Sequence, residues 1–264
     1  MGKIVRQNQV KKSVSNRPLI TIITATYNAE KYLPAAIQSI REQTYDNIEY
    51  IIVDGGSTDS TLDIIKDNES IVDHWISEPD SGIYNAWNKG VRLSHGDWIA
   101  FLGADDRYLE SAISQYVTLI LDCNAPPPQY ISSRVNLILG STVLRTIGEK
   151  WKWPTFCRYM NVAHVGSLHH RSLFERYGSF DESYRASGDY EFLLRPRSNL
   201  VASYLNEITV SMNVEGISNT NKISFCETEK AKISTGGRSI LLCRIEKYWA
   251  LIKWKLRKVI DNQF

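Results

Sequence analysis

The sequence predicts an α/β fold with a mostly parallel central sheet flanked by helices, as in a Rossmann-like domain. The first hundred residues alternate apolar strand patterns with helical patterns, which is typical of a parallel sheet covered on both faces. Each expected strand runs into polar residues, and right-handed crossovers would bring these strand ends to one edge of the sheet. A chain of 264 residues with 43% hydrophobic residues can also bury a large core.

The spacing of apolar residues predicts each element of this first half. β-Branched residues dominate 18–26, and apolar residues recur at helical intervals in 30–43. The expected elements are strands at 18–26, 47–53, 71–77 and 99–104, with helices at 30–43, around 62–65 and towards residue 90.

Two adjacent carboxylates, Asp105 and Asp106, directly follow the apolar run of residues 99–104. Neighbouring carboxylates repel each other unless a positive charge lies beside them. A hard divalent cation that also binds a phosphate would relieve this repulsion. The alternative is that one of the two acids caps the helix that follows.

The other strand ends carry polar clusters as well. Thr26 and Asn28 follow the first strand, and Asp54 follows the second, in a turn whose glycines allow close approach of the backbone. Glu78 and Asp80 follow the third strand. Together, these clusters predict one ligand site at the carboxyl edge of the sheet.

Further along, Asn85, Asn88 and Lys89 are candidates for the same edge, where Lys89 either touches a phosphate or faces solvent. The chain has neither GxGxxG after its first strand nor GxxxxGK[ST], which argues against a dinucleotide site and a P-loop NTPase.

A proline-rich break at 124–129 predicts a boundary between two halves. The expected units are a basic N-terminal arm (1–17), a nucleotide half (18–125), a second half (126–215) and a basic, helical C-terminal extension (216–264). In the second half, Asp189 heads a helix, as its cap or as a general base. His164, His169 and His170 either ligate metal or phosphate or fill structural positions.

Charge and cysteine content limit the possible partners. The net charge of +2 argues against a nucleic-acid partner, although both ends are basic. Residues 240–260 carry apolar residues, among them Trp249, Ile252, Leu256 and Ile260, at helical intervals with cations between them. They fit either a helix on an anionic membrane or a packed terminal helix. The four cysteines lack CxxC spacing, which predicts a reducing cytosol, and no apolar run is long enough for a membrane span.

Five motifs occur in order: TATYNAEKYL, VDGGSTDST, EPDSGIYNAWNKG, FLGADD and GSFDESYRASGDYEFLLR. Over residues 18–195 the chain resembles glycosyltransferase family 2, whose members are inverting enzymes with the GT-A fold. The resemblance implies that Thr26 and Tyr27 line the nucleotide pocket, that Asp105 lies near the ribose, that Asp106 binds metal and that Asp189 is the catalytic base. The further candidates at this site are Asn28, Asp54, Asp80, Asn88 and Lys89 for the nucleotide and His164 for the metal.

In that family the acid after the second strand contacts the nucleotide base, and many members have two acids there, where this chain has Asp54 followed by Gly55. The resemblance therefore implies that the base contact is either missing or shifted to Asp54. It also implies that residues 18–125 bind the nucleotide sugar and that residues 126–215 bind the acceptor and supply the catalytic base. The implied reaction moves one sugar from a nucleoside-diphosphate sugar to a glycan or a lipid-linked acceptor, with Mg²⁺ or Mn²⁺. UDP is the expected nucleotide, with GDP or dTDP as alternatives. The QxxRW motif of processive members is absent after Asp189, so a single transfer per encounter is expected.

The expected setting is surface polysaccharide synthesis in the cytoplasm, with possible contact to the inner face of the membrane. Gly55 leaves open an inactive nucleotide-sugar-binding or scaffold protein on the same fold. A nucleotidyltransferase ranks last because no glycine-rich, basic triphosphate loop follows the first strand.

Overall fold

The computed structural model describes residues 11–14, 16–123, 126–214 and 223–261, with the side chains of the last helix described as far as Lys255. The strands and helices expected in the first half are present, and several are shorter than expected. In chain order this half contains β1 (Ile20–Thr26), α1 (Leu33–Arg41), β2 (Ile48–Asp54), α2 (Thr61–Asp67), β3 (His74–Ser77), α3 (Ile83–Leu93), β4 (Trp98–Gly103), β5 (Arg107–Tyr108) and α4 (Ala112–Asp122).

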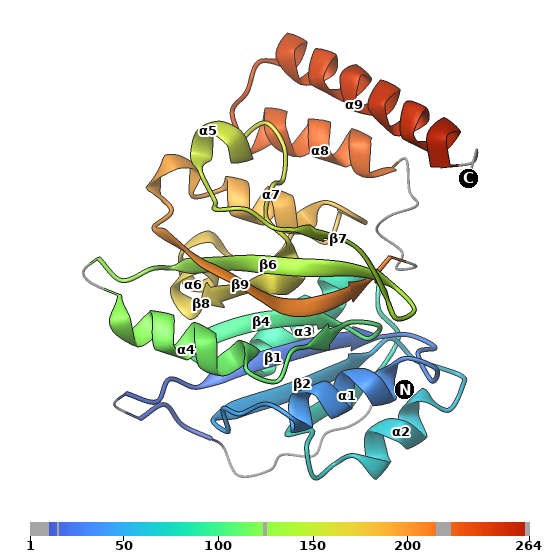
Figure 1. Ribbon diagram of the computed structural model, residues 1–264, viewed down its shortest axis with the longest axis vertical. Helices are drawn as coiled ribbons and strands as arrows, with labels where there is room; N and C mark the ends of the chain where they lie inside the picture. Colours follow the sequence, from blue (N-terminus) through green and yellow to red (C-terminus); the bar gives the residue numbers. More distant parts are fainter. Residues whose placement is uncertain (1–10, 15, 124–125, 215–222, 262–264) are drawn as a thin grey trace.

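The second half adds strands to the same sheet and covers one of its faces with helices (Figure 1). It contains β6 (Tyr130–Leu139), β7 (Thr142–Ile147), α5 (Trp153–Phe156), η1 (His164–Gly166), β8 (Ser167–His170), α6 (Arg171–Tyr177), α7 (Gly188–Leu194), η2 (Arg197–Asn199), β9 (Ala202–Asn213), α8 (Ile223–Ser234) and α9 (Ile240–Asp261).

The described residues form a nine-stranded sheet with the order β3-β2-β1-β4-β8-β6-β9-β5, and β7 pairs with β6. The strands β1 to β4 are mutually parallel, as the alternating pattern predicts. From β4 onward the sheet is mixed, because β8 runs antiparallel to both β4 and β6 while β6 and β9 are parallel. The α/β architecture is therefore confirmed, and both halves of the chain share one sheet.

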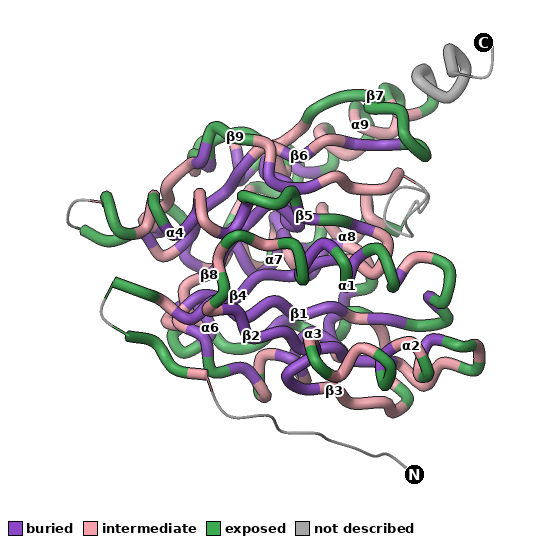
Figure 2. Tube along the Cα trace, turned by 60° about the horizontal axis from the view of Figure 1, so that its bottom comes forward, coloured by how far each residue is buried: buried purple, intermediate pink, exposed green. Residues whose placement is uncertain are grey.

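Both faces of the sheet's first half are buried, as the continuous apolar runs of β1 and β2 require. Ile22 of β1 packs in a cluster with residues of α1 and α4, whereas the next residue, Ile23, packs in the opposite cluster with α3 and α7. Figure 2 shows this part of the sheet as a run of buried residues. Gly90 allows α3 to approach β1 closely, since a Cβ there would lie 2.5 Å from Cγ2 of Ile23.

The C-terminal helices form an outer layer in which α9 stacks on α8 and α8 packs against α7 (Figure 1). The helix expected at 240–260 is thus present as α9. Within the described part of the chain, no helix has the length and apolar character needed to cross a bilayer. Of the expected N-terminal arm, residues 1–10 lie outside the described residues, while Lys11 forms an ion pair of 2.9 Å with Asp73.

Candidate active site

The carboxyl ends of the parallel strands bring polar side chains together at one edge of the sheet. The strand register places Thr26 opposite Asp54, and Asp54 opposite Ser77. Asp105 and Asp106 follow β4, which lies on the other side of β1. Residues distant in sequence therefore meet where open α/β sheets bind ligands.

The carboxylates of Asp105 and Asp106 both fold back over Gly103. A Cβ on Gly103 would lie 2.5 Å from Oδ2 of Asp106 and 3.0 Å from Oδ1 of Asp105, so the two oxygens converge on one place. The backbone N–H of Asn213 donates to Oδ1 of Asp106 at 3.1 Å. Burial, together with the charge of Asp105, raises the pKa of Asp106 to about 7, and burial also raises the pKa of Asp105.

Two converging, partly desolvated carboxylates are a suitable oxygen donor set for Mg²⁺ or Mn²⁺. A cation between them would offset both causes of the raised pKa values, the repulsion and the loss of solvent. The residues present at this position therefore fit a hard divalent ion.

Asp54 has a different environment, although it also ends a parallel strand. It is fully buried and accepts hydrogen bonds from the hydroxyls of Thr26 (3.0 Å), Ser57 and Ser77 (2.7 Å). The backbone N–H groups of Gly56 and Ser57 also donate to it, at 3.0 and 2.9 Å. Asp54 therefore holds the turn after β2 in shape, and its oxygens are already occupied by protein donors.

The carboxylate of Asp80 occupies the space beside Gly55. A Cβ on Gly55 would lie 2.7 Å from Oδ2 of Asp80, whose Oδ1 accepts the N–H of Gly82 at 2.8 Å. The acid missing after Asp54 is thus matched in space by an acid from the loop after β3. The sequence alone did not link the two positions, because they lie in different loops.

Asp189 lies in the first turn of α7 and is partly buried as a residue, with its carboxyl group in a buried environment. The hydroxyl of Tyr84 on α3 donates to its Oδ1 at 3.1 Å. Burial raises the pKa of Asp189, and the hydrogen bond from Tyr84 partly opposes that rise. Since α3 begins just after β3, this contact places Asp189 at the carboxyl edge of the sheet.

Two residues that sequence reasoning did not assign hold Asp189 in place. Tyr84 lies within the motif EPDSGIYNAWNKG, where no local pattern gives it a role. Glu227 of α8 accepts the backbone N–H groups of Arg185, Ala186 and Ser187 at 2.7, 2.8 and 3.0 Å, in the segment that leads into α7. No local pattern reveals Glu227, because the contact joins segments about forty residues apart in sequence.

Other candidate residues at this edge make contacts within the protein. Asn88 is buried. Its side-chain amide accepts the N–H of Phe180 and donates to the carbonyl of Phe180, both at 2.9 Å. Lys89 forms an ion pair of 2.8 Å with Glu78. These contacts tie α3 to neighbouring loops.

Near the end of β1, Tyr27 is exposed. Asn28 adopts a positive φ of 48° and accepts the N–H of Thr58 through its side chain at 2.9 Å. The pair therefore lies where the loops after β1 and β2 meet.

His164 lies in an aromatic cluster on the α3 face of the sheet. Its ring stacks on Trp87 at 4.9 Å and on Phe101 at 5.2 Å, measured between ring centroids. Burial lowers the pKa of His164 to about 3, so the ring is neutral. His169 is 4.9 Å away with a pKa that is also lowered by burial, whereas His170 caps α6 by accepting the N–H of Ser172.

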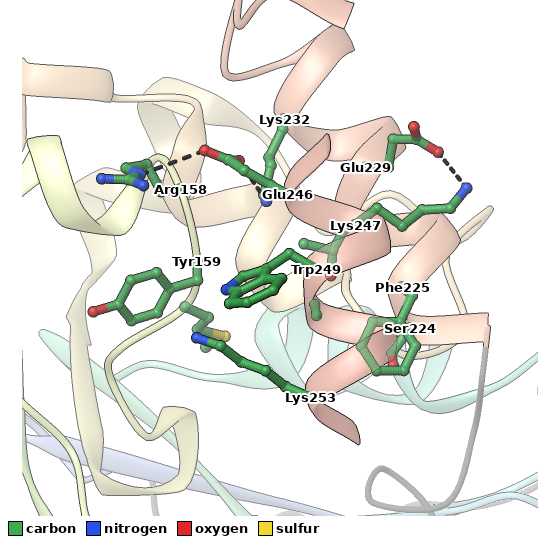
Figure 3. Close-up of a pocket in the computed structure, with 13 residues that line it drawn as sticks. Arg158, Tyr159, Ser224, Phe225, Glu229, Lys232, Glu246, Lys247, Trp249 and Lys253 are labelled. Atoms are coloured by element: carbon green, nitrogen blue, oxygen red, sulfur yellow. Dashed lines mark hydrogen bonds and ion pairs between the residues drawn. The ribbon is translucent and has the colours of Figure 1, made fainter. Parts of the chain in front are cut away.

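A separate pocket of about 440 Å³ opens between α8, α9 and the segment 158–160 (Figure 3). Tyr159, Phe225 and Trp249 give it aromatic walls, and Lys253 lies over the Trp249 ring at 5.4 Å. Glu246 at its rim binds Lys232 at 3.0 Å. The pocket joins aromatic surface to cations, of which Arg158 and Lys232 pair with Glu246 and Lys247 pairs with Glu229.

Comparison with known proteins decides the family. Residues 21–156 match the family described as Glycosyl transferase family 2. A PGL/p-HBAD biosynthesis glycosyltransferase of Mycobacterium tuberculosis is 33% identical over 215 residues, covering 77% of this chain and 80% of the relative. The chain belongs to glycosyltransferase family 2. It is therefore a glycosyltransferase, as its motifs suggested.

Solved structures show the same fold. S. aureus TarS 1–349 in complex with UDP-GlcNAc matches with a TM-score of 0.69 and 16% identity, covering 85% of this chain and 69% of that one. Glucosyl-3-phosphoglycerate synthase of M. tuberculosis, solved with Mn²⁺ and UDP, matches with a TM-score of 0.59 and 15% identity, covering 84% of this chain and 81% of that one. The GT-A fold of this family 2 glycosyltransferase is thereby confirmed.

Proposed function

We infer that this glycosyltransferase inverts the anomeric centre and moves one sugar per encounter from a nucleoside-diphosphate sugar to an acceptor hydroxyl. One observation carries the proposal. The converging carboxylates of Asp105 and Asp106 and the buried carboxylate of Asp189 belong to the same edge of the sheet, although they come from different halves of the chain. The first pair suits a charged leaving group, and Asp189 suits a proton acceptor.

Asp106, with Asp105 beside it, would hold Mg²⁺ or Mn²⁺, which neutralises charge on a departing diphosphate. Asp189 would take the proton of the acceptor hydroxyl as that oxygen attacks the anomeric carbon from the face opposite the leaving group. Its raised pKa supports this role, because a carboxylate with a pKa closer to neutrality is a stronger base. Tyr84 keeps the carboxylate in one orientation through its 3.1 Å hydrogen bond.

The position of Asp80 supports its role as the acid that recognises the nucleotide base. Its carboxylate lies against Gly55, the position of the second acid in many relatives. A carboxylate accepts the imide N–H of uracil or the N1–H of guanine, and cytosine offers no such N–H at the matching ring position. UDP is the expected nucleotide, since the TarS and phosphoglycerate synthase structures contain UDP-GlcNAc and UDP.

A Gly55→Asp substitution tests this assignment. The new Cβ alone would lie 2.7 Å from Oδ2 of Asp80, and the added carboxylate would repel it, so UDP binding should weaken by about tenfold or more. The double variant Gly55→Asp/Asp80→Gly should recover most of the affinity, measured by titration calorimetry. Undiminished UDP binding by Asp80→Ala would contradict the assignment.

The surface of α9 supports a lipid-linked acceptor and contact with the inner face of an anionic membrane. Leu241, Ile245, Tyr248 and Ile252 recur along one helical face, and all are exposed. The exposed cations Arg244 and Lys255 lie next to this stripe on the helical wheel of α9. The expected contribution of Leu256 and Ile260 falls outside the side chains that the structure describes. Apolar residues flanked by cations fit a helix lying in the interface of an anionic bilayer.

Co-sedimentation with anionic vesicles tests the membrane contact. Binding should drop when Leu241 and Ile245 are both changed to Ser, and a neutral phosphatidylcholine vesicle should bind the unchanged chain more weakly. Equal binding by the double variant would count against this role of α9. A lipid-linked acceptor at a membrane would agree with a role of this enzyme in surface polysaccharide synthesis.

The central experiment is a screen of nucleoside-diphosphate sugars with Mg²⁺ or Mn²⁺ that measures released diphosphate, with NMR of the product to assign the anomer. Asp189→Asn should lower turnover by about two to four orders of magnitude without unfolding the chain. Asp122→Asn, an exposed acid at the end of α4, is the matched control. A retained anomer, or full activity of Asp189→Asn, would overturn the mechanism. UDP binding without turnover of any donor would leave the alternative of an inactive nucleotide-sugar-binding scaffold.

A further inference from the structure

A second cluster of ligating side chains lies at the opposite, amino edge of the sheet. Glu49 is the second residue of β2, His74 is the first residue of β3, and His95 lies between α3 and β4. Their ligand atoms all lie within 4.8 Å of one another, and within the described part of the chain this is the one group of three or more such residues so arranged. We propose that Glu49, His74 and His95 bind a zinc ion.

The carboxylate of Glu49 is fixed with one oxygen turned towards both imidazoles. Its Oε2 accepts the hydroxyl of Thr21 at 2.6 Å and the backbone N–H of His95 at 2.8 Å. Its Oε1 lies 2.7 Å from Nδ1 of His95 and 3.5 Å from Nε2 of His74. Outer hydrogen bonds of this kind orient the ligands of metal sites.

The spacing between Glu49 and His74 suits a tetrahedral ion with one open position, whereas the 2.7 Å contact between Glu49 and His95 has to lengthen to admit it. Tetrahedral zinc keeps its ligand atoms about 3.4 Å apart, close to the 3.5 Å between Glu49 and His74. Glu49 and His74 are buried, whereas the side chain of His95 is 40% exposed. His95 can therefore shift to complete the site, and water can occupy the fourth position.

The donor set separates this site from the acidic pair after β4. Two imidazole nitrogens and one carboxylate are typical zinc ligands, whereas Mg²⁺ prefers oxygen alone. Glu49 and Asp54 are at opposite ends of β2, about 16 Å apart along the strand. The zinc would link β2, β3 and the connection before β4, and it would stabilise the folded chain because the unfolded chain lacks this arrangement.

The test uses the full-length chain after chelator treatment, with excess Mg²⁺ present so that the acidic pair is occupied. Zinc titration by calorimetry should show one bound ion and a higher melting temperature. Co²⁺ in place of zinc should give the visible absorption of a tetrahedral site. His95→Gln, a change on an exposed side chain, should weaken zinc binding by at least about tenfold and remove the Co²⁺ signal.

His170→Gln is the matched control, because His170 is also partly exposed and lies outside the cluster. Asp106→Asn should bind zinc as the unchanged chain does. Equal zinc affinity in His95→Gln, zinc binding lost in Asp106→Asn, or no zinc bound by the unchanged chain would each overturn the proposal. None of these readouts depends on transferase activity, so the site and the proposed reaction can fail separately.

Discussion

The loops after β2 and β4 both carry acids at the ends of parallel strands, yet the two sets of carboxylates differ in nearly every contact. Asp54 accepts five hydrogen bonds, from the side chains of three residues and from two backbone N–H groups. Asp106 accepts the N–H of Asn213 and faces the charge of Asp105, and its pKa is raised to about 7. Asp54 is thus surrounded by donors of the protein, whereas Asp106 has a backbone donor on one oxygen and a second carboxylate beside it.

From this difference we infer that Asp54 shapes its loop and that Asp106 serves the proposed metal. A buried carboxylate whose oxygens already accept five hydrogen bonds has little capacity left for a metal. A buried carboxylate beside a second carboxylate is stabilised by a cation that binds between them. The position of an acid at the end of a strand is therefore insufficient to assign its role. The number of hydrogen-bond donors around its carboxylate oxygens is the more informative observation.

Of the changes in these two loops, Asp106→Asn should have the larger effect on turnover. The amide keeps the shape of the side chain but removes the charge that would hold the metal, so turnover should fall by about a thousandfold. The melting temperature should stay level or rise, because the repulsion from Asp105 is gone. Initial rates of nucleoside diphosphate release and a thermal melt measure both. A variant that unfolds would show that Asp106, like Asp54, serves mainly to hold the loop.

Asp54→Asn should act mainly on stability. The new NH₂ group would face donors that now point at a carboxylate, so the free energy of unfolding should fall by about 3 kcal/mol. Urea denaturation of the chain and its variant measures this loss. If Asp54→Asn left stability unchanged and abolished the metal dependence of turnover, the roles assigned to the two loops would be reversed.

Tyr84→Phe should move the pH profile of kcat/KM. Asp189 lies between Asp54, which has side-chain donors from three residues, and Asp106, whose donor is a backbone N–H, because Asp189 accepts the hydroxyl of Tyr84. The tyrosine hydroxyl favours the charged carboxylate, so its removal should raise the pKa of Asp189 further. The acidic limb of kcat/KM should shift to higher pH by about one unit. Phe180→Leu, on the same aromatic cluster, controls for packing around Tyr84. An unmoved limb would show that another group is the base.

The smallest expected effect is the influence of pH on the stabilisation of the chain by Mn²⁺. Because the folded-state pKa of Asp106 is raised to about 7, its contribution to stability is present at low pH and is lost as the pH rises towards and through 7. Mn²⁺ needs the ionised form, so it should raise the melting temperature by about 3 °C more at pH 8 than at pH 6. Asp106→Asn should abolish this difference, which differential scanning fluorimetry resolves. A pH-independent metal shift would argue that the ion binds elsewhere.

Much of the fold followed from the sequence. The alternation of apolar runs with helical periodicity in residues 18–103 indicated parallel strands with buried faces, and β1 to β4 have that arrangement. The motif order indicated the family, and the acids after β4 were identified as a pair. These features are local, because periodicity and short motifs depend on residues close together in the chain.

Other features appeared only in the tertiary structure. The antiparallel β8 within the sheet, the carboxylate of Asp80 beside Gly55 and the support of Asp189 by Tyr84 and Glu227 all join distant segments. The convergence of Glu49 with His74 and His95 is of the same kind. The sequence determined which strands and acids are present. Only the folded chain decided which acids are surrounded by donors, because that depends on the neighbours that other strands and helices bring to each carboxylate.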